Sequence, residues 1–191
     1  MATDKANKDL LAAVEGSDPA GVRAALARGA SPNTTAGGLF DYPVLIWAVM
    51  KQSWSASDLE IFNVVLGQPG INVNQRGRYA TGRGWSALMV AARRGYTEAC
   101  TALLKGGADP HLTSHRGCNA IWQAAWAGHR QAIEAIISWG GDPKKKDNSG
   151  ESPAEAARRQ GHEDLASWLS IQEQLPPHHV GQEQEQLPPL L

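Results

Sequence analysis

The stretch Gly84-Trp-Ser-Ala-Leu-Met-Val-Ala-Ala-Arg-Arg-Gly95 decides the fold, because its pattern returns at a fixed step along the chain. Its closing glycine recurs as Gly128 and Gly161, 33 residues apart each time, and its opening glycine as Gly117 and Gly150. Such a period is typical of stacked supersecondary units, each of which buries its apolar face only against its neighbours. The sequence therefore predicts a solenoid, and we expect its function to reside on a surface.

The residues of one period resemble the ankyrin repeat. After Ser86-Ala-Leu88 come the paired alanines and the glycine, then Leu103-Leu104, then Gly107-Ala-Asp109. The resemblance implies an all-α ankyrin-repeat solenoid of helix-turn-helix units joined by β-hairpin-like loops. It also implies a non-catalytic role in protein recognition. In this family the binding surface consists of hairpin tips and the solvent side of each first helix.

Read in the same register, the chain is predicted to hold five repeats within an ankyrin domain over residues 4–170. Their approximate bounds are 4–35, 36–75, 76–112, 113–145 and 146–170. Asp18-Pro19 is expected to cap a helix, and Ser152-Pro-Ala-Glu155 forms a capping box that opens the last repeat. The hairpin at 76–83 is longer than the period requires, which is consistent either with a binding loop or with neutral insertion.

Residues 171–191 differ in composition from the repeats and are predicted to form a Pro/Gln-rich flexible tail. Glu173-Gln-Leu-Pro-Pro177 is nearly duplicated as Glu185-Gln-Leu-Pro-Pro189. The tail is either a polyproline-type ligand motif or an inert extension. It could also dock into a groove of its own chain or of a neighbouring copy, so the oligomeric state stays open between a monomer and a tail-mediated assembly.

The amino-acid composition excludes several classes of function. A formal net charge of −1 disfavours a bulk electrostatic grip on nucleic acid. The longest apolar stretch, 44–50, is too short to span a bilayer, and residues 1–11 lack the apolar run of a signal peptide. Cys100 and Cys118 are the only cysteines and are expected to be reduced. We therefore expect a cytoplasmic or nuclear protein that is neither secreted nor membrane-bound.

Candidate binding residues are those that depart from the repeat on the predicted concave surface. Trp85 and Trp126 stand where other copies are mostly polar, whereas the other five tryptophans are interpreted as packing residues. Arginines gather on the long hairpin and the helix after it. Arginine with tryptophan suits a carboxylate, a phosphate or an aromatic peptide. The predicted partner-binding set is Trp85, Trp126, Arg83, Arg93, Arg94, Arg116, Met50, Lys51, Tyr79 and Arg159.

Catalysis and cofactors find little support in the sequence. His111, His115 and Cys118 have a metal-like spacing but lack an evident fourth ligand. No nucleophile elbow or phosphate loop is present, so we predict no enzyme, no metal and no cofactor. His129 and His162, which follow repeat glycines, are interpreted as structural. The main prediction is a protein or peptide partner, acidic or aromatic, and the alternative is a nucleotide or oligonucleotide on the same surface.

Overall fold

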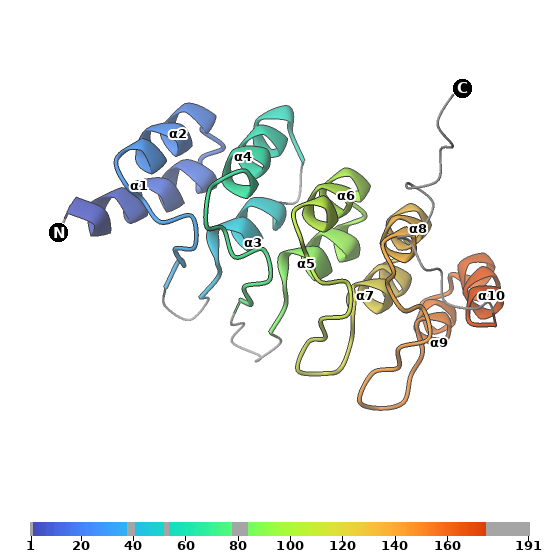
Figure 1. Cartoon of the computed structure of the whole chain (residues 1–191). Helices are drawn as coiled ribbons and strands as arrows, with labels where there is room; N and C mark the ends of the chain where they lie inside the picture. Colours follow the sequence, from blue (N-terminus) through green and yellow to red (C-terminus); the bar gives the residue numbers. More distant parts are fainter. Residues whose placement is uncertain (1, 38–40, 52–53, 78–83, 175–191) are drawn as a thin grey trace, which may run out of the picture.

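The structure, a computed structural model, describes residues 2–37, 41–51, 54–77 and 84–174. These residues form a row of helix pairs stacked side by side, with α1 and α10 at opposite ends (Figure 1). Within the described ranges there is no strand, only isolated bridges at two hairpins. The predicted all-α ankyrin-type solenoid is confirmed. The helices are α1 Ala2–Glu15, α2 Pro19–Ala27, α3 Val44–Val49, α4 Ala56–Leu66, α5 Ala87–Arg94, α6 Thr97–Lys105, α7 Ala120–Ala127, α8 Arg130–Ser138, α9 Pro153–Arg159 and α10 Glu163–Gln172.

The odd-numbered helices form one row beside the hairpin loops, and the even-numbered helices form the second row (Figure 1). We call the odd-numbered row the inner helices. α1 begins and α10 ends two residues beyond the predicted range of 4–170. Tail residues 175–191 lie outside the described residues, and the predictions for them stay predictions.

Local signals start and end the inner helices. The side chains of Ser86 and Asn119 accept hydrogen bonds from backbone N–H groups three residues on, and Ser152 forms the predicted capping box. Such caps stabilise a helix by about 1 kcal/mol. Asp18 differs from expectation. It precedes α2, but its carboxylate lies over Gly21 and makes no capping hydrogen bond.

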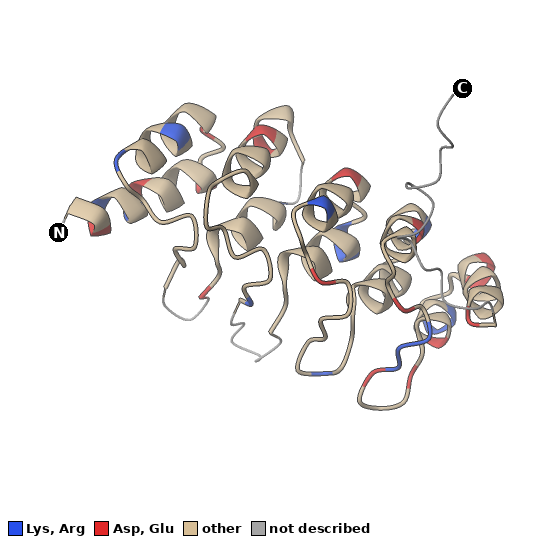
Figure 2. Ribbon diagram, in the orientation of Figure 1, with Lys and Arg blue, Asp and Glu red and all other residues tan. Residues whose placement is uncertain are grey.

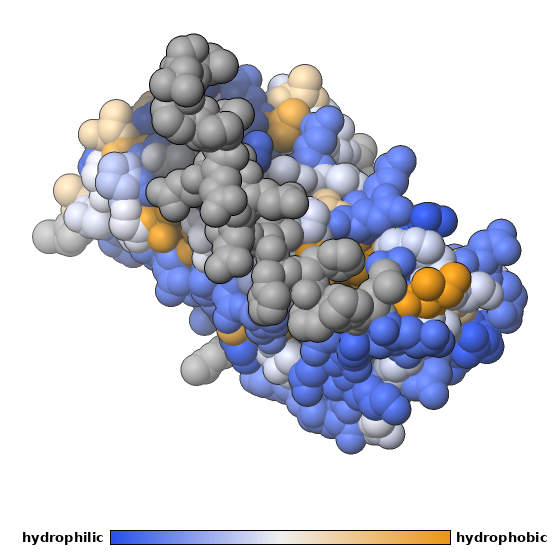
Figure 3. All heavy atoms as spheres, turned by 45° about the vertical axis from the view of Figure 1, so that its right-hand side comes forward, coloured by the Kyte–Doolittle hydropathy of each residue, from blue (hydrophilic) through white to orange (hydrophobic). Residues whose placement is uncertain are grey.

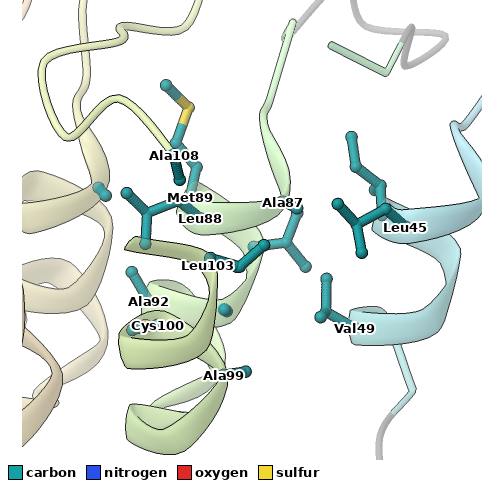
Figure 4. Close-up of a cluster of buried hydrophobic side chains, with 14 of the residues drawn as sticks. Leu45, Val49, Ala87, Leu88, Met89, Ala92, Ala99, Cys100, Leu103 and Ala108 are labelled. Atoms are coloured by element: carbon teal, nitrogen blue, oxygen red, sulfur yellow. The ribbon is translucent and has the colours of Figure 1, made fainter. Parts of the chain in front are cut away.

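The core runs continuously from one repeat to the next. In Figure 4, Leu45 and Val49 of α3 point toward Ala87 of α5, and Leu103 of α6 completes the cluster. Paired alanines, among them Ala91 and its neighbour on α5, are fully buried and allow adjacent inner helices to approach closely. Each helix pair therefore depends on its neighbours for burial, as the 33-residue period predicted.

The glycine that ends an inner helix receives a histidine ring from the next repeat. Gly95 and Gly128 adopt left-handed φ values of +72° and +82°. A Cβ at Gly95 would meet the His129 ring, and one at Gly128 would meet the His162 ring. This contact confirms that the two histidines are structural, because their rings fill space that only glycine leaves open.

Acidification is expected to destabilise the fold in part through His129. Burial, the largest cause, and the charge of His162 lower the His129 pKa, although a hydrogen bond to the Arg93 backbone opposes them. The unfolded chain therefore binds this proton more readily than the folded chain. The resulting stability is present above the unfolded pKa of about 6.5 and is lost as pH falls through the folded pKa.

This pH effect can be measured by urea unfolding at about pH 7.5 and about pH 5.5. The loss of unfolding free energy between the two conditions should be smaller for His129→Gln than for the wild-type chain. Equal losses in the two proteins would show that His129 does not carry the effect.

Candidate functional site: an arginine and tryptophan pocket

A pocket of about 260 Å³ lies where α5, α7 and α9 meet the hairpin that precedes α7. We call it the Arg/Trp pocket. It contains five of the predicted binding residues, which come from three consecutive repeats. The lining residues are Trp85, Arg93, Ser114, Arg116, Cys118, Trp122, Gln123, Trp126 and Arg159.

Arg93 occupies the centre of this pocket. Its Cζ lies 3.9 Å from the centroid of Trp126 and 5.5 Å from that of Trp85. Its Nη1 donates a hydrogen bond of 3.3 Å to Oε1 of Gln123, a buried side chain on α7. A guanidinium over indole rings is attracted by their electron-rich faces. The α5 cation is thereby fixed against the neighbouring repeat.

The two predicted aromatic anchors differ in exposure. Trp85 is only 7% exposed, so it offers a ligand little surface of its own. Trp126 is partly exposed on α7. Of the two, Trp126 therefore has the larger surface available for contact with a partner.

The charges at the rim of the Arg/Trp pocket are partly balanced. Arg159 donates two hydrogen bonds to the Glu151 carboxylate, of 2.6 and 3.0 Å. Asp147 lies close enough for the positive charge of Arg116 to help lower its pKa; burial, the largest single cause, acts in the opposite direction. With Arg93, three guanidiniums and two carboxylates leave one positive charge in excess.

Other predicted binding residues serve contacts within the chain. Lys51 Nζ donates to the Glu15 carbonyl at 2.7 Å and to Ser17 Oγ at 2.6 Å. Arg94 Nη2 donates to the Met50 carbonyl at 2.8 Å. These residues join the α1, α3 and α5 repeats and do not line the Arg/Trp pocket. Partner contacts of Met50, Lys51 and Arg94 stay predictions, and the proposal below concerns the Arg/Trp pocket alone. Tyr79 and Arg83 lie outside the described residues.

Comparison with protein families identifies the architecture. A family model described as Ankyrin repeats (3 copies) matches residues 45–147 and 88–176. The chain belongs to the ankyrin repeat family. Ankyrin repeats generally mediate protein–protein interaction, bind protein partners and are typically non-catalytic. Comparison with curated proteins found no match.

Four residues of this ankyrin pocket were not predicted as ligand contacts: Ser114, Cys118, Trp122 and Gln123. All four are buried. Gln123 carried a signal in the sequence, because the equivalent positions one period away hold Val90 and Ala156. Trp122 was interpreted as a packing residue, and its indole is indeed only 4% exposed. Its polar Nε1, however, finds no hydrogen-bond partner in the described part of the chain.

Burial, the largest cause, and the charge of Asp147 raise the pKa of the Cys118 thiol, which disfavours the reactive thiolate. Across the described ranges, no group of three or more His, Cys, Asp or Glu side chains is placed to hold a metal ion. Nor is any described helix long and apolar enough to cross a membrane.

The remaining surface of the ankyrin domain offers no large apolar patch. Trp139 and Ile171 are the only large hydrophobic residues that are clearly exposed in the described ranges. In Figure 3, hydrophobic surface forms small areas separated by hydrophilic residues. Acidic and basic residues both occur at several places along the stack (Figure 2).

Proposed function

We propose that this ankyrin domain binds an extended segment of a protein partner at the Arg/Trp pocket, without catalysis. The sequence predicted a groove over the second to fourth repeats, whereas the pocket residues come from the third to fifth. The proposal rests chiefly on one observation, the Arg93 guanidinium held between Trp126 and Trp85.

This arrangement favours binding for two physical reasons. Arginine and tryptophan are enriched among the residues that contribute most to protein interfaces. A side chain that is already fixed also loses little conformational entropy when a partner binds. Arg93 is fixed by two rings and by Gln123. Its side chain has therefore already lost most of its conformational entropy on folding, before a partner binds.

Trp126→Ala is expected to weaken partner binding by about 2 kcal/mol, or roughly 30-fold in Kd. The substitution removes the partly exposed indole and also releases Arg93. The partner would be identified by crosslinking in the native cell, and affinity then measured by calorimetry with the purified partner. Trp139→Ala is the matched control, because Trp139 is 42% exposed, follows the last residue of α8 and does not line the pocket.

An unchanged Kd for Trp126→Ala, in a protein with native circular dichroism, would refute the proposed binding site. Equal losses in Trp126→Ala and Trp139→Ala would indicate a general effect on the fold rather than a contact. Only a selective loss in Trp126→Ala supports the proposal.

Recognition of a nucleotide or oligonucleotide is the second candidate function, because guanidinium and indole groups also suit phosphates and bases. The single excess positive charge makes a polyanion a poorer match than a protein segment. Phosphate contacts would make binding fall steeply between low and moderate salt. Docking of the chain's own tail would instead make the affinity for an added peptide rise when residues 175–191 are removed.

A further inference from the structure

Trp122, one of the residues that line the Arg/Trp pocket, has a buried hydrogen-bond donor. The residue is 4% exposed, and its Nε1 has no acceptor among the residues that the structure describes. An indole N–H can only donate. Burying such a group without a partner is costly, and most buried polar atoms in proteins are paired. Trp122 lines the pocket, and a bound group that reached Nε1 would supply the missing acceptor.

The hydrogen-bond acceptors in and beside the pocket already accept hydrogen bonds from its arginine side chains. Gln123 Oε1 accepts from Arg93, and both carboxylate oxygens of Glu151 accept from Arg159. The Ser114 hydroxyl, buried in the same wall, is able to donate as well as accept. A ligand group that brings acceptors therefore matches this lining better than one that brings donors.

The charge of the pocket further narrows the chemical class of the ligand. The three arginines that line the pocket exceed by one the two carboxylates beside them, Glu151 and Asp147, and Arg116 is exposed on the hairpin at the rim. A guanidinium forms stronger hydrogen bonds with an ionised acceptor than with a neutral one. One carboxylate balances one excess charge, whereas a phosphate group would bring close to two negative charges.

We infer that the Arg/Trp pocket binds the side-chain carboxylate of an aspartate or glutamate in the partner segment. Trp122 Nε1 would donate a hydrogen bond to the carboxylate, Arg116 would supply the balancing charge, and Trp126 would contact the flanking residues. This inference rests on the proposed function, because it names the group that the proposed partner inserts.

The probe for the test is a phage-displayed library of random 12-residue peptides, selected on the full chain. Enriched peptides that fail to bind Trp126→Ala are expected to share one Asp or Glu. In synthetic versions, changing that residue to Asn or Gln should weaken binding about tenfold or more, because a hydrogen bond to a charged group is lost. This comparison uses the unaltered protein and does not depend on any variant folding.

The matched protein variant is Trp122→Phe, which removes the N–H and retains an aromatic ring. It should weaken binding of the acidic peptide by about tenfold and that of the amide version by less, because a neutral amide oxygen is a weaker acceptor than a carboxylate. Trp54→Phe is the control, because Trp54 contacts Phe62 and Tyr96 away from the pocket. A Trp122→Phe loss that is equal for acidic and amide peptides would overturn the role of its N–H.

The remaining outcomes separate the inference from the proposed function. Peptides whose binding needs Trp126 but that share no acidic residue would refute the inference that the pocket binds a carboxylate. The proposed function would be unaffected by that result. If inorganic phosphate displaced the acidic peptide at concentrations where acetate did not, the preferred anion would be a phosphate and not a carboxylate. If no enriched peptide depended on Trp126, both proposals would fail.

Discussion

Gly95→Ala is expected to lower the free energy of unfolding by at least about 2 kcal/mol. Two costs act at this position. Its φ of +72° lies in the left-handed region, which disfavours a residue with a Cβ by about 1–2 kcal/mol. In addition, the new Cβ would lie 2.6 Å from Nδ1 of His129, so the ring that joins two repeats must move. Urea unfolding followed by circular dichroism would measure the change.

Gly161→Ala is the matched control for this prediction. Gly161 ends the last inner helix with a φ of +83°, but no heavy atom lies within 4 Å of its Cβ position. Its alanine variant should therefore show the backbone cost alone, about 1 kcal/mol. Combining Gly95→Ala with His129→Ala should recover part of the loss caused by the contact. Equal destabilisation at Gly95 and Gly161 would show that the histidine contact is unimportant.

Asp58→Ala is expected to cost about 3 kcal/mol, because it leaves a partly buried cation without its partner. Asp58 is 4% exposed and accepts hydrogen bonds from the Ser17 hydroxyl and from both the backbone N–H and the hydroxyl of Ser55. Lys51 Nζ lies 3.5 Å away. This cluster links the turn after α1 to the start of α4, so the substitution should loosen the first two repeats together.

The effect of Asp58 should depend on pH. Burial, the largest single cause, raises its pKa, but hydrogen bonds from Ser55 and Ser17 and the charge of Lys51 together lower it. The folded pKa therefore lies below the unfolded value of about 3.9. The contribution is present above that value and is lost as pH falls through the folded pKa. The difference between wild type and Asp58→Ala should accordingly shrink below about pH 4.

Glu155→Ala provides the control for Asp58, since both acids complete a capping box. Glu155 is exposed and pairs with no buried cation, so its loss should cost about 1 kcal/mol or less. The two variants would be compared by urea unfolding at neutral pH. If they were equally destabilised, the cost at Asp58 would reflect capping alone and not the buried cluster.

Much of the fold followed from local patterns that repeat. The glycines, alanine pairs and leucine pairs recur because every repeat makes the same contacts with its neighbours, so each pattern appears several times in one sequence. The contacts of individual polar side chains did not follow from these patterns. Arg93 and Trp126 were predicted and lie together, yet Arg94, the next residue in the sequence, bonds to the Met50 carbonyl of the preceding repeat.

The sequence by itself determined the solenoid, the positions of its turns and the involvement of arginine and tryptophan, since these depend on periodicity and residue type. Only the tertiary structure decided which of those side chains meet. Trp85 became mostly buried beside Arg93, Lys51 turned toward Asp58, and Trp122 retained a donor without an acceptor. The physical reason is that a hydrogen bond or ring contact between repeats depends on distances of a few ångströms and on side-chain direction, which a sequence period leaves undetermined.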